Sequence, residues 1–185
     1  MAVPVAVAQP DRPLRVLFLC THNSARSQLA EGILRLRGGE QVDVYSAGSH
    51  PTTVHPMALA LLKEHGIDTS RHSAKSLDQF AGQSFDFVIT VCDRVRDRCP
   101  EFPDDPLHIH WSFLDPAMAA DDGQAAGGIH RFMDAERAPG PIDEAGRRQA
   151  FQTLWLELNT RIGYLLQLPH PVTGRRLSVA RASEH

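Results

Sequence analysis

The stretch from Cys20 to Ser27 combines a cysteine, five residues, an arginine and a serine, a spacing suited to binding a tetrahedral oxyanion. The guanidinium of Arg26 presents paired N–H donors that match two oxygens of such an anion. A cysteine beside an arginine and a helix N-terminus is expected to have a lowered pKa and to be a thiolate at neutral pH. We therefore predict that Cys20 is a thiolate nucleophile directed at a bound anion. The loop that follows it would hold the anion, and its residues are Thr21, His22, Asn23, Ser24, Ala25, Arg26 and Ser27.

The secondary structure predicted around this loop would build an anion cradle. The apolar run 15–19 predicts a buried strand and 28–37 predicts a helix, so the loop joins a strand end to a helix start. Backbone N–H groups in such a loop point inward, and the helix N-terminus adds positive charge. Two alternatives involve no chemistry: a lone cysteine at a strand end is often an inert core residue, and Ser24 can cap the helix. The narrow spacing between Cys20 and Arg26 favours the catalytic interpretation.

Cys92 and Cys99 form a second reactive group, in a segment that also holds Arg94, Arg96 and Arg98. If the segment is helical, the two cysteine Cα atoms are about 10.5 Å apart, whereas a disulfide needs them within about 7 Å. Oxidation would therefore unwind the segment and make it a redox switch that a partner can recognise. Neighbouring cations favour thiol exchange. Alternatively, the two cysteines are unrelated, one buried at the strand end and one exposed by chance.

Strands that alternate with helices predict an α/β fold. After the first strand and helix, we predict strands at 42–47, 85–91 and 107–109, and helices at 56–65, 76–80 and 149–168. This order is typical of a doubly wound parallel sheet of four strands with helices on both faces. Ligands of such sheets bind at the carboxyl ends of the strands, where both Cys20 and Cys92 fall.

Length and composition favour one domain. With 185 residues, 42% of them hydrophobic, the chain is long enough to bury a sizeable core. We place the domain at 14–168, between a flexible lead at 1–13 and a flexible basic tail at 169–185. A net charge of −3 argues against nucleic acid as a partner. Since no apolar run reaches the roughly 20 residues of a membrane span and the N-terminus lacks a basic start, we expect a cytoplasmic protein.

The cysteine spacing argues against two kinds of site, and one irregular stretch leaves its role open. The three cysteines lack the paired spacing of a zinc site, and their odd number argues against a secreted disulfide framework. The irregular stretch 116–140 is rich in Ala, Gly and Asp. It is either a flap over the site or a solvated loop, and we favour the loop.

The loop from Cys20 to Ser27 resembles that of the low-molecular-weight protein tyrosine phosphatase superfamily, and the pair Cys92 and Cys99 resembles its thioredoxin-coupled arsenate reductases. The resemblance covers 15–168 and implies a flavodoxin-like fold and the reduction of arsenate to arsenite, a reaction of arsenic detoxification. It also implies a relay. Cys20 would attack arsenate, Cys92 would attack Cys20 and expel arsenite, and Cys99 would attack Cys92, leaving a disulfide that thioredoxin reduces.

Asp115, followed by Pro116, is similar to the superfamily's aspartate-proline loop, which implies that its carboxylic acid protonates the leaving oxygen. The phosphatase branch has tyrosines shortly after this pair, which line the pocket of an aryl substrate. Here the residues that follow are small or flexible, so an aryl phosphate would lose a stacking surface. They are Ala117, Met118, Ala119 and Ala120. This departure disfavours phosphotyrosine as the substrate.

The chain also departs from the reductase pattern. His22 and Ala25 stand where that branch often has glycine and another cysteine, but neither position carries a required side chain. Some reductases bind potassium near residues that match Asn23, Glu31 and Ser46. Lys75 falls where an acidic ligand is expected, so we expect no metal and no other cofactor.

Two alternative functions and the identity of the reductant stay open. A low-molecular-weight phosphatase would use Cys20, Arg26 and Asp115 in the same roles and hydrolyse phosphomonoesters through a thiophosphate intermediate on Cys20. A redox-responsive binding module would hold oxyanions and signal through Cys92 and Cys99. Thioredoxin is the favoured reductant because two resolving cysteines are present, but mycothiol, or glutathione with a glutaredoxin, needs only Cys20.

Overall fold

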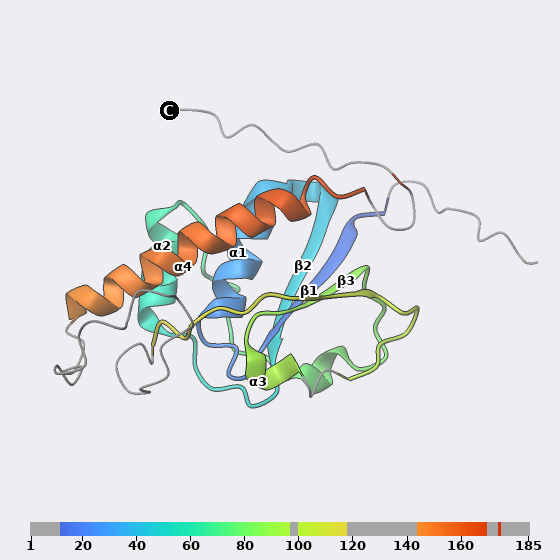
Figure 1. Ribbon diagram of the computed structural model, residues 1–185, viewed down its shortest axis with the longest axis horizontal. Coiled ribbons are helices and arrows are strands. Elements are labelled where there is room, and N and C mark those ends of the chain that lie inside the picture. Colours follow the sequence, from blue (N-terminus) through green and yellow to red (C-terminus); the bar gives the residue numbers. More distant parts are fainter. Residues whose placement is uncertain (1–11, 97–99, 118–143, 170–173, 175–185) are drawn as a thin grey trace, which may run out of the picture.

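The computed structural model describes residues 12–96, 100–117, 144–169 and 174. Within them, four parallel strands form one sheet in the order β2-β1-β3-β4. The strands are β1 (Leu14–Cys20), β2 (Val42–Gly48), β3 (Phe87–Thr90) and β4 (Leu107–His110). The four predicted strands are confirmed, with β3 shorter than the predicted 85–91. Their carboxyl ends meet at the lower edge of the molecule in Figure 1, where α3 (Asp93–Arg96) also lies.

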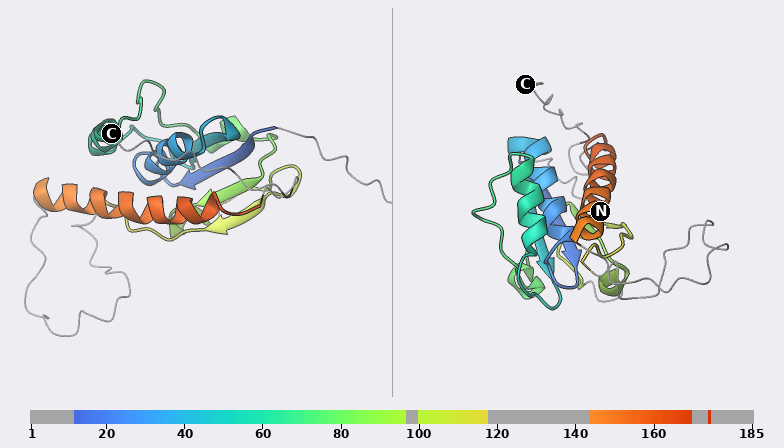
Figure 2. Two further views of the ribbon diagram at one scale, coloured as in Figure 1. Left: turned by 90° about the horizontal axis from the view of Figure 1, so that it is seen from above. Right: turned by 90° about the vertical axis from the view of Figure 1, so that its left-hand side faces the viewer.

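The predicted helices follow the strands, but the closing helix spans Glu144–Leu165 rather than 149–168, and the short α3 was not among those predicted. The helices are α1 (Arg26–Gly38), α2 (Pro56–Glu64), α3 (Asp93–Arg96) and α4 (Glu144–Leu165), with the short 3-10 helices η1 (Gly39–Gln41) and η2 (Leu77–Phe80). The helices α2, α1 and α4 lie side by side (Figure 2). None of the described helices is long and apolar enough to cross a membrane.

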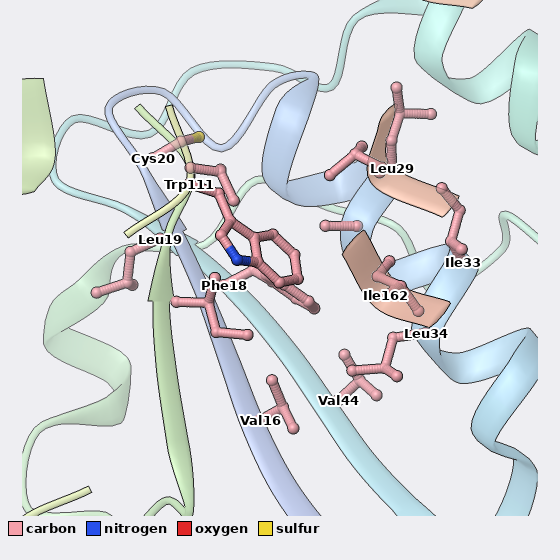
Figure 3. Close-up of a cluster of buried hydrophobic side chains, with 14 of the residues drawn as sticks. Val16, Phe18, Leu19, Cys20, Leu29, Ile33, Leu34, Val44, Trp111 and Ile162 are labelled. Carbon is pink, nitrogen blue, oxygen red and sulfur yellow. The ribbon is translucent and has the colours of Figure 1, made fainter. Parts of the chain in front are cut away.

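The core lies between the sheet and the helices α1 and α4. Val16, Phe18 and Val44 point from β1 and β2 toward the helices (Figure 3). They meet buried side chains of α1 and α4, which are Leu29, Ile33, Leu34 and Ile162. Cys20 lies at the end of β1 beyond this layer, so the packing of β1 against α1 fixes where its sulfur emerges.

The opposite face of the sheet carries an aromatic cluster. Because side chains alternate along a strand, Tyr45 points away from the face that Val44 shares with α1. Its ring centroid lies 5.7 Å from that of Phe80 in η2 and 5.8 Å from that of Phe85, which in turn lies 5.5 Å from Phe102. The predicted cover on both faces is thus confirmed, although this face is covered by η2 and loops around it.

Some predictions fall on residues that the structure does not describe. Cys99 lies outside the described residues, and so do most of the predicted lead at 1–13, the irregular stretch 116–140 and the tail at 169–185. Their predicted states stay predictions.

Candidate active site

The loop between β1 and α1 has carbonyl groups turned outward. Backbone N–H groups from 49–55 donate to the carbonyls of Cys20, Thr21, His22 and Ser24 at 2.8–3.3 Å. In a trans peptide the next N–H points the opposite way from the carbonyl, so the following amides face into the loop. The N–H of Asn23 does so and donates to Cys20 Sγ at 3.0 Å. This is the geometry of an anion-binding nest at a helix N-terminus.

The start of α1 corrects one expectation. Ala25, not Ser24, occupies the capping position, and none of the described side chains caps the helix there. The backbone carbonyl of Ser24 instead accepts the N–H of His55, the residue that precedes α2. The N-terminal amides of α1 are therefore oriented toward the loop without a side chain that would compete with an anion.

Asn23 is the centre of the hydrogen bonds that hold the loop. Its backbone has a positive φ of 49°, a conformation that asparagine tolerates better than most residues. Its Nδ2 donates to Ser27 Oγ and Ser46 Oγ, each at 2.8 Å. Its Oδ1 accepts from Lys75 N at 2.8 Å and from Gln28 Nε2 at 3.0 Å. Sequence reasoning placed Asn23 in the loop but missed this role, because two of its partners, Ser46 and Lys75, are distant in sequence.

Gly48 is a second residue that sequence reasoning did not assign to the site. It ends β2 beside the loop, and a Cβ built on it would lie 2.8 Å from both Asn23 N and Thr21 O. These are backbone atoms, so they cannot yield as a flexible side chain would. The available signal was a glycine at the end of a strand that neighbours a predicted anion loop.

Cys20 is enclosed, with 2% of its surface exposed. Burial raises the pKa of its thiol above the ordinary value; the hydrogen bond with Ser27 Oγ, 2.9 Å from Sγ, and the charge of Arg26 oppose this effect. The lowered pKa expected from the sequence is therefore wrong for this arrangement. The pKa is raised because burial removes water from around the sulfur. Arg26 directs its guanidinium N–H groups to Asp115 and the Phe113 carbonyl, so its charge only partly offsets this loss.

Asp115 is brought to the loop by the segment that follows β4. Its Oδ2 accepts from Arg26 Nη2 at 2.7 Å, and Arg26 Nη1 donates to the Phe113 carbonyl at 3.2 Å. The buried rings of Trp111 and Phe113 pack against each other, and the guanidinium of Arg161 lies 4.5 Å above the Phe113 ring. This packing fixes the course of the chain up to Asp115, so the residue to which the resemblance assigns the acid role lies beside Arg26.

Cys92 lies next to the same loop. It follows β3, is 3% exposed, and its Sγ lies 3.4 Å from Thr21 Oγ1. After burial, Cys92 is a further, smaller cause that raises the pKa of Cys20. The structure thus brings together Cys20, Arg26, Cys92 and Asp115, and the residues directly after Cys92 form the short helix α3.

The residues that match a potassium site do not fit that ion. The Glu31 carboxylate is 3% exposed and accepts from Ser46 Oγ. It also pairs with Arg35 at 2.5 Å and with the Lys75 ammonium at 3.3 Å. Two cationic side chains already balance the single buried carboxylate, so a further cation would meet repulsion there.

A parallel sheet with Cys20, Arg26 and Asp115 around an inward-facing amide loop has the geometry of an oxyanion-binding α/β site of the phosphatase type. The chain belongs to the low molecular weight phosphotyrosine protein phosphatase family, whose sequence profile matches residues 15–113.

Similar proteins place the chain nearer to one part of this family. The arsenate reductase of Halalkalibacterium halodurans is 40% identical over 133 residues, which are 72% of this chain and 90% of that protein. The arsenate reductase of Bacillus subtilis is 40% identical over 104 residues, 56% of this chain and 75% of that protein.

Solved structures agree with these sequences. A thioredoxin-dependent arsenate reductase of Corynebacterium glutamicum has a TM-score of 0.57 and 28% identity, covering 85% of this chain but only 62% of that chain. An arsenate reductase in its oxidised state has a TM-score of 0.60 and 26% identity, covering 82% of this chain and 95% of that chain.

Proposed function

We propose that this chain is an arsenate reductase that uses Cys20 as its nucleophile and Cys92 as its first resolving thiol. The observation that carries the proposal is the position of Cys92, buried beside Thr21 of the anion loop, 3.4 Å from the threonine hydroxyl. Hydrolysis of a phosphate ester needs no second thiol there. The likeness to several arsenate reductases supports the same substrate.

The electrons balance with two thiols per arsenate. Cys20 Sγ attacks arsenic and forms an S–As bond, while one arsenate oxygen leaves as water. Because Cys20 is buried and its pKa is raised, its proton passes to an oxygen of the bound arsenate dianion. Cys92 Sγ then attacks Cys20 Sγ and gives its proton to an arsenic-bound oxygen. The S–As bond breaks, and its electron pair reduces As(V) to As(III). The products are arsenite and a Cys20–Cys92 disulfide.

Arg26 and Asp115 have separate roles in this scheme. Arg26 binds two oxygens of arsenate and stabilises the charge that develops on them. Asp115, released from Arg26 when arsenate binds, relays the Cys20 proton to the leaving oxygen, which departs as water. Their present ion pair at 2.7 Å keeps both groups at the mouth of the loop.

We further infer that Cys99 resolves the first disulfide and passes it to thioredoxin. The thioredoxin-dependent neighbour and the two cysteines after β3 support this donor. Such thiol chemistry fits the reducing cytoplasm. The two cations paired with Glu31 support turnover that is independent of potassium.

A second candidate function is hydrolysis of phosphomonoesters. The family to which the chain belongs favours it, and so does the placement of Asp115 against Arg26. In that case Cys20 would form a thiophosphate that water hydrolyses, and Cys92 would take no part.

The test is arsenite production by the reduced chain with arsenate, thioredoxin, thioredoxin reductase and NADPH, run in parallel with p-nitrophenyl phosphate hydrolysis. We expect Cys20→Ser to abolish both activities and Cys92→Ser to abolish only arsenite production. A Cys92→Ser variant that still turns over arsenate at the parent rate would refute the assigned role of Cys92. Potassium chloride against sodium chloride tests the cation proposal in the same assay.

A further inference from the structure

A cluster of polar side chains beside Cys92 has no role in the scheme above. Asp93, the first residue of α3, accepts hydrogen bonds from His110 Nε2 at 2.9 Å and from Ser112 Oγ at 3.1 Å. His110 ends β4, and its Nδ1 lies 2.7 Å from the hydroxyl of Thr90, which ends β3. We call Thr90, His110, Ser112 and Asp93 the β3-β4 clasp. It joins two strand ends to the residue directly after Cys92.

The clasp does not form a second catalytic site. A carboxylate, an imidazole and a hydroxyl in series have the order of a catalytic triad. However, Thr90 is 5% exposed and lies in register with His110 inside the sheet, so a substrate cannot reach its hydroxyl. The arrangement therefore acts on the chain itself.

The geometry fixes both ends of the His110 ring. One ring nitrogen is held by Thr90 and the other by Asp93, so the ring cannot turn without losing a contact. The hydrogen bonds from His110 and then from Ser112 lower the pKa of Asp93, so its carboxylate is ionised at neutral pH and accepts from both. The Asp93 side chain is 75% exposed, and exposed contacts of this kind are individually weak. Such a clasp can hold the segment and still open.

Cys92 is placed between the clasp and the anion loop. Thr90 precedes it by two residues and Asp93 follows it, while its own Sγ faces Thr21 Oγ1. Val95, two residues after Asp93 in α3, is fully buried and gives the segment a second anchor. The direction of the Cys92 side chain is thus set by backbone held on either side of it.

We propose that His110 is a positioning residue, which holds Asp93 at the ends of β3 and β4 and so keeps Cys92 Sγ directed toward Thr21 and Cys20. The step it assists, the attack of Cys92 on Cys20, rests on the proposed function. The placement of Cys92 itself can be measured without any arsenate.

The first experiment isolates that step. In a Cys99→Ser background the reaction stops at the Cys20–Cys92 disulfide, and arsenite release is followed in a single turnover. We expect His110→Phe to slow release roughly tenfold at saturating arsenate, with the half-saturating concentration unchanged, because the sulfur is misdirected. His110→Gln, whose amide can still donate to Asp93, should recover most of the rate. His108→Phe on the same strand is the matched control.

The second experiment needs no reductase activity. In a chain carrying Cys20→Ser and Cys99→Ser, Cys92 is alkylated with iodoacetamide. We expect His110→Phe to raise the rate roughly fivefold, because loss of the clasp lets the segment open, and His108→Phe to leave it unchanged. Asp93→Ala should act like His110→Phe and replaces it if that variant does not fold.

The outcomes separate the two proposals. If the parent releases no arsenite but the clasp variants expose Cys92, the proposed function fails and the clasp stands. If the parent releases arsenite and His110→Phe changes neither the release rate nor the alkylation of Cys92, the positioning role is refuted.

Discussion

At the residue scale, the site depends on which groups accept the guanidinium N–H donors of Arg26. In this structure its two terminal nitrogens face Asp115 and the carbonyl of Phe113. An oxyanion in the loop competes with Asp115 for the same guanidinium. The carboxylic acid and the anion-binding arginine are therefore coupled by one contact, which makes Asp115 the most informative residue to change.

Replacing Asp115 with Asn should lower arsenate turnover and p-nitrophenyl phosphate hydrolysis by about two orders of magnitude or more, because the general acid is lost. Competitive inhibition by phosphate should persist, since Arg26 and the loop amides remain. Steady-state kinetics with phosphate as inhibitor measure both quantities, and Asp78→Asn on the exposed surface serves as control. Equal loss of turnover and of phosphate affinity would contradict the assigned role.

Ser27 tests the environment of the nucleophile. Because its hydrogen bond lowers a Cys20 pKa that burial raises, Ser27→Ala should move the alkylation of Cys20 to higher pH and slow it about fivefold at pH 7, the effect of about 1 kcal/mol. Iodoacetamide rates from pH 6 to 10, in a chain carrying Cys92→Ser and Cys99→Ser, measure this. Ser46→Ala removes a hydroxyl that contacts Asn23 but not Cys20, and should leave the profile in place.

At the element scale, β2 and the segment after it shape the loop as much as β1 and α1 do. The 49–55 segment holds the loop carbonyls outward, and Gly48 lets β2 approach the loop backbone. The hydrogen bond between Asn23 and Ser46 then ties the loop to β2 beside Cys20. The anion loop is thus a joint product of two neighbouring strand ends.

Gly48→Ala should therefore distort the loop, because its methyl carbon would lie 2.8 Å from Asn23 N and Thr21 O. We expect the inhibition constant for phosphate to rise at least about tenfold, with a loss of stability of roughly 1–3 kcal/mol. Inhibition assays and urea unfolding measure the two effects. Gly82 is exposed and has a positive φ of 75°, and a Cβ built on it would lie in open space. Gly82→Ala is therefore a control for backbone strain alone. Unchanged phosphate affinity in Gly48→Ala would contradict this account.

Whether the sequence predicts a part of this site depends on how far apart in the sequence the contacting residues lie. Cys20 and Arg26 are recognisable because one short loop holds both, and hydrophobic periodicity places Cys92 at a neighbouring strand end. The hub at Asn23 and the clasp at His110 depend on strand register, which local patterns do not contain. The direction of the Cys20 pKa shift was predicted wrongly, because the burial of a side chain depends on how the whole chain packs.

At the scale of the whole molecule, buried polar groups link the site to folding stability. Gln28 Nε2 donates to Asn23 and Ser73, so Gln28 Oε1 faces His72 Nδ1 at 2.8 Å and that nitrogen carries the proton. His72 Nε2 is buried with no hydrogen-bond partner among the described residues. A second proton there would be buried near Arg35 and Lys75.

Stability should therefore fall in mild acid. Burial lowers the pKa of His72, so its contribution is present above the ordinary histidine value of about 6.5 and is lost as pH falls through the lowered pKa. Urea midpoints at pH 7.5 and 5 should differ less in His72→Asn, which keeps a donor for Gln28 but does not titrate. His50→Asn, at an exposed histidine, is the control. An equal pH dependence in His72→Asn and the parent would contradict the assignment.

The most direct test of the account is a single turnover with arsenate and no external reductant. The fully reduced Cys99→Ser chain is mixed with arsenate, and arsenite and free thiols are counted. We predict about one arsenite per chain and the loss of about two thiols, with peptide mapping that finds Cys20 joined to Cys92. No arsenite and intact thiols, in a chain that hydrolyses p-nitrophenyl phosphate, would contradict the reductase and leave a phosphatase.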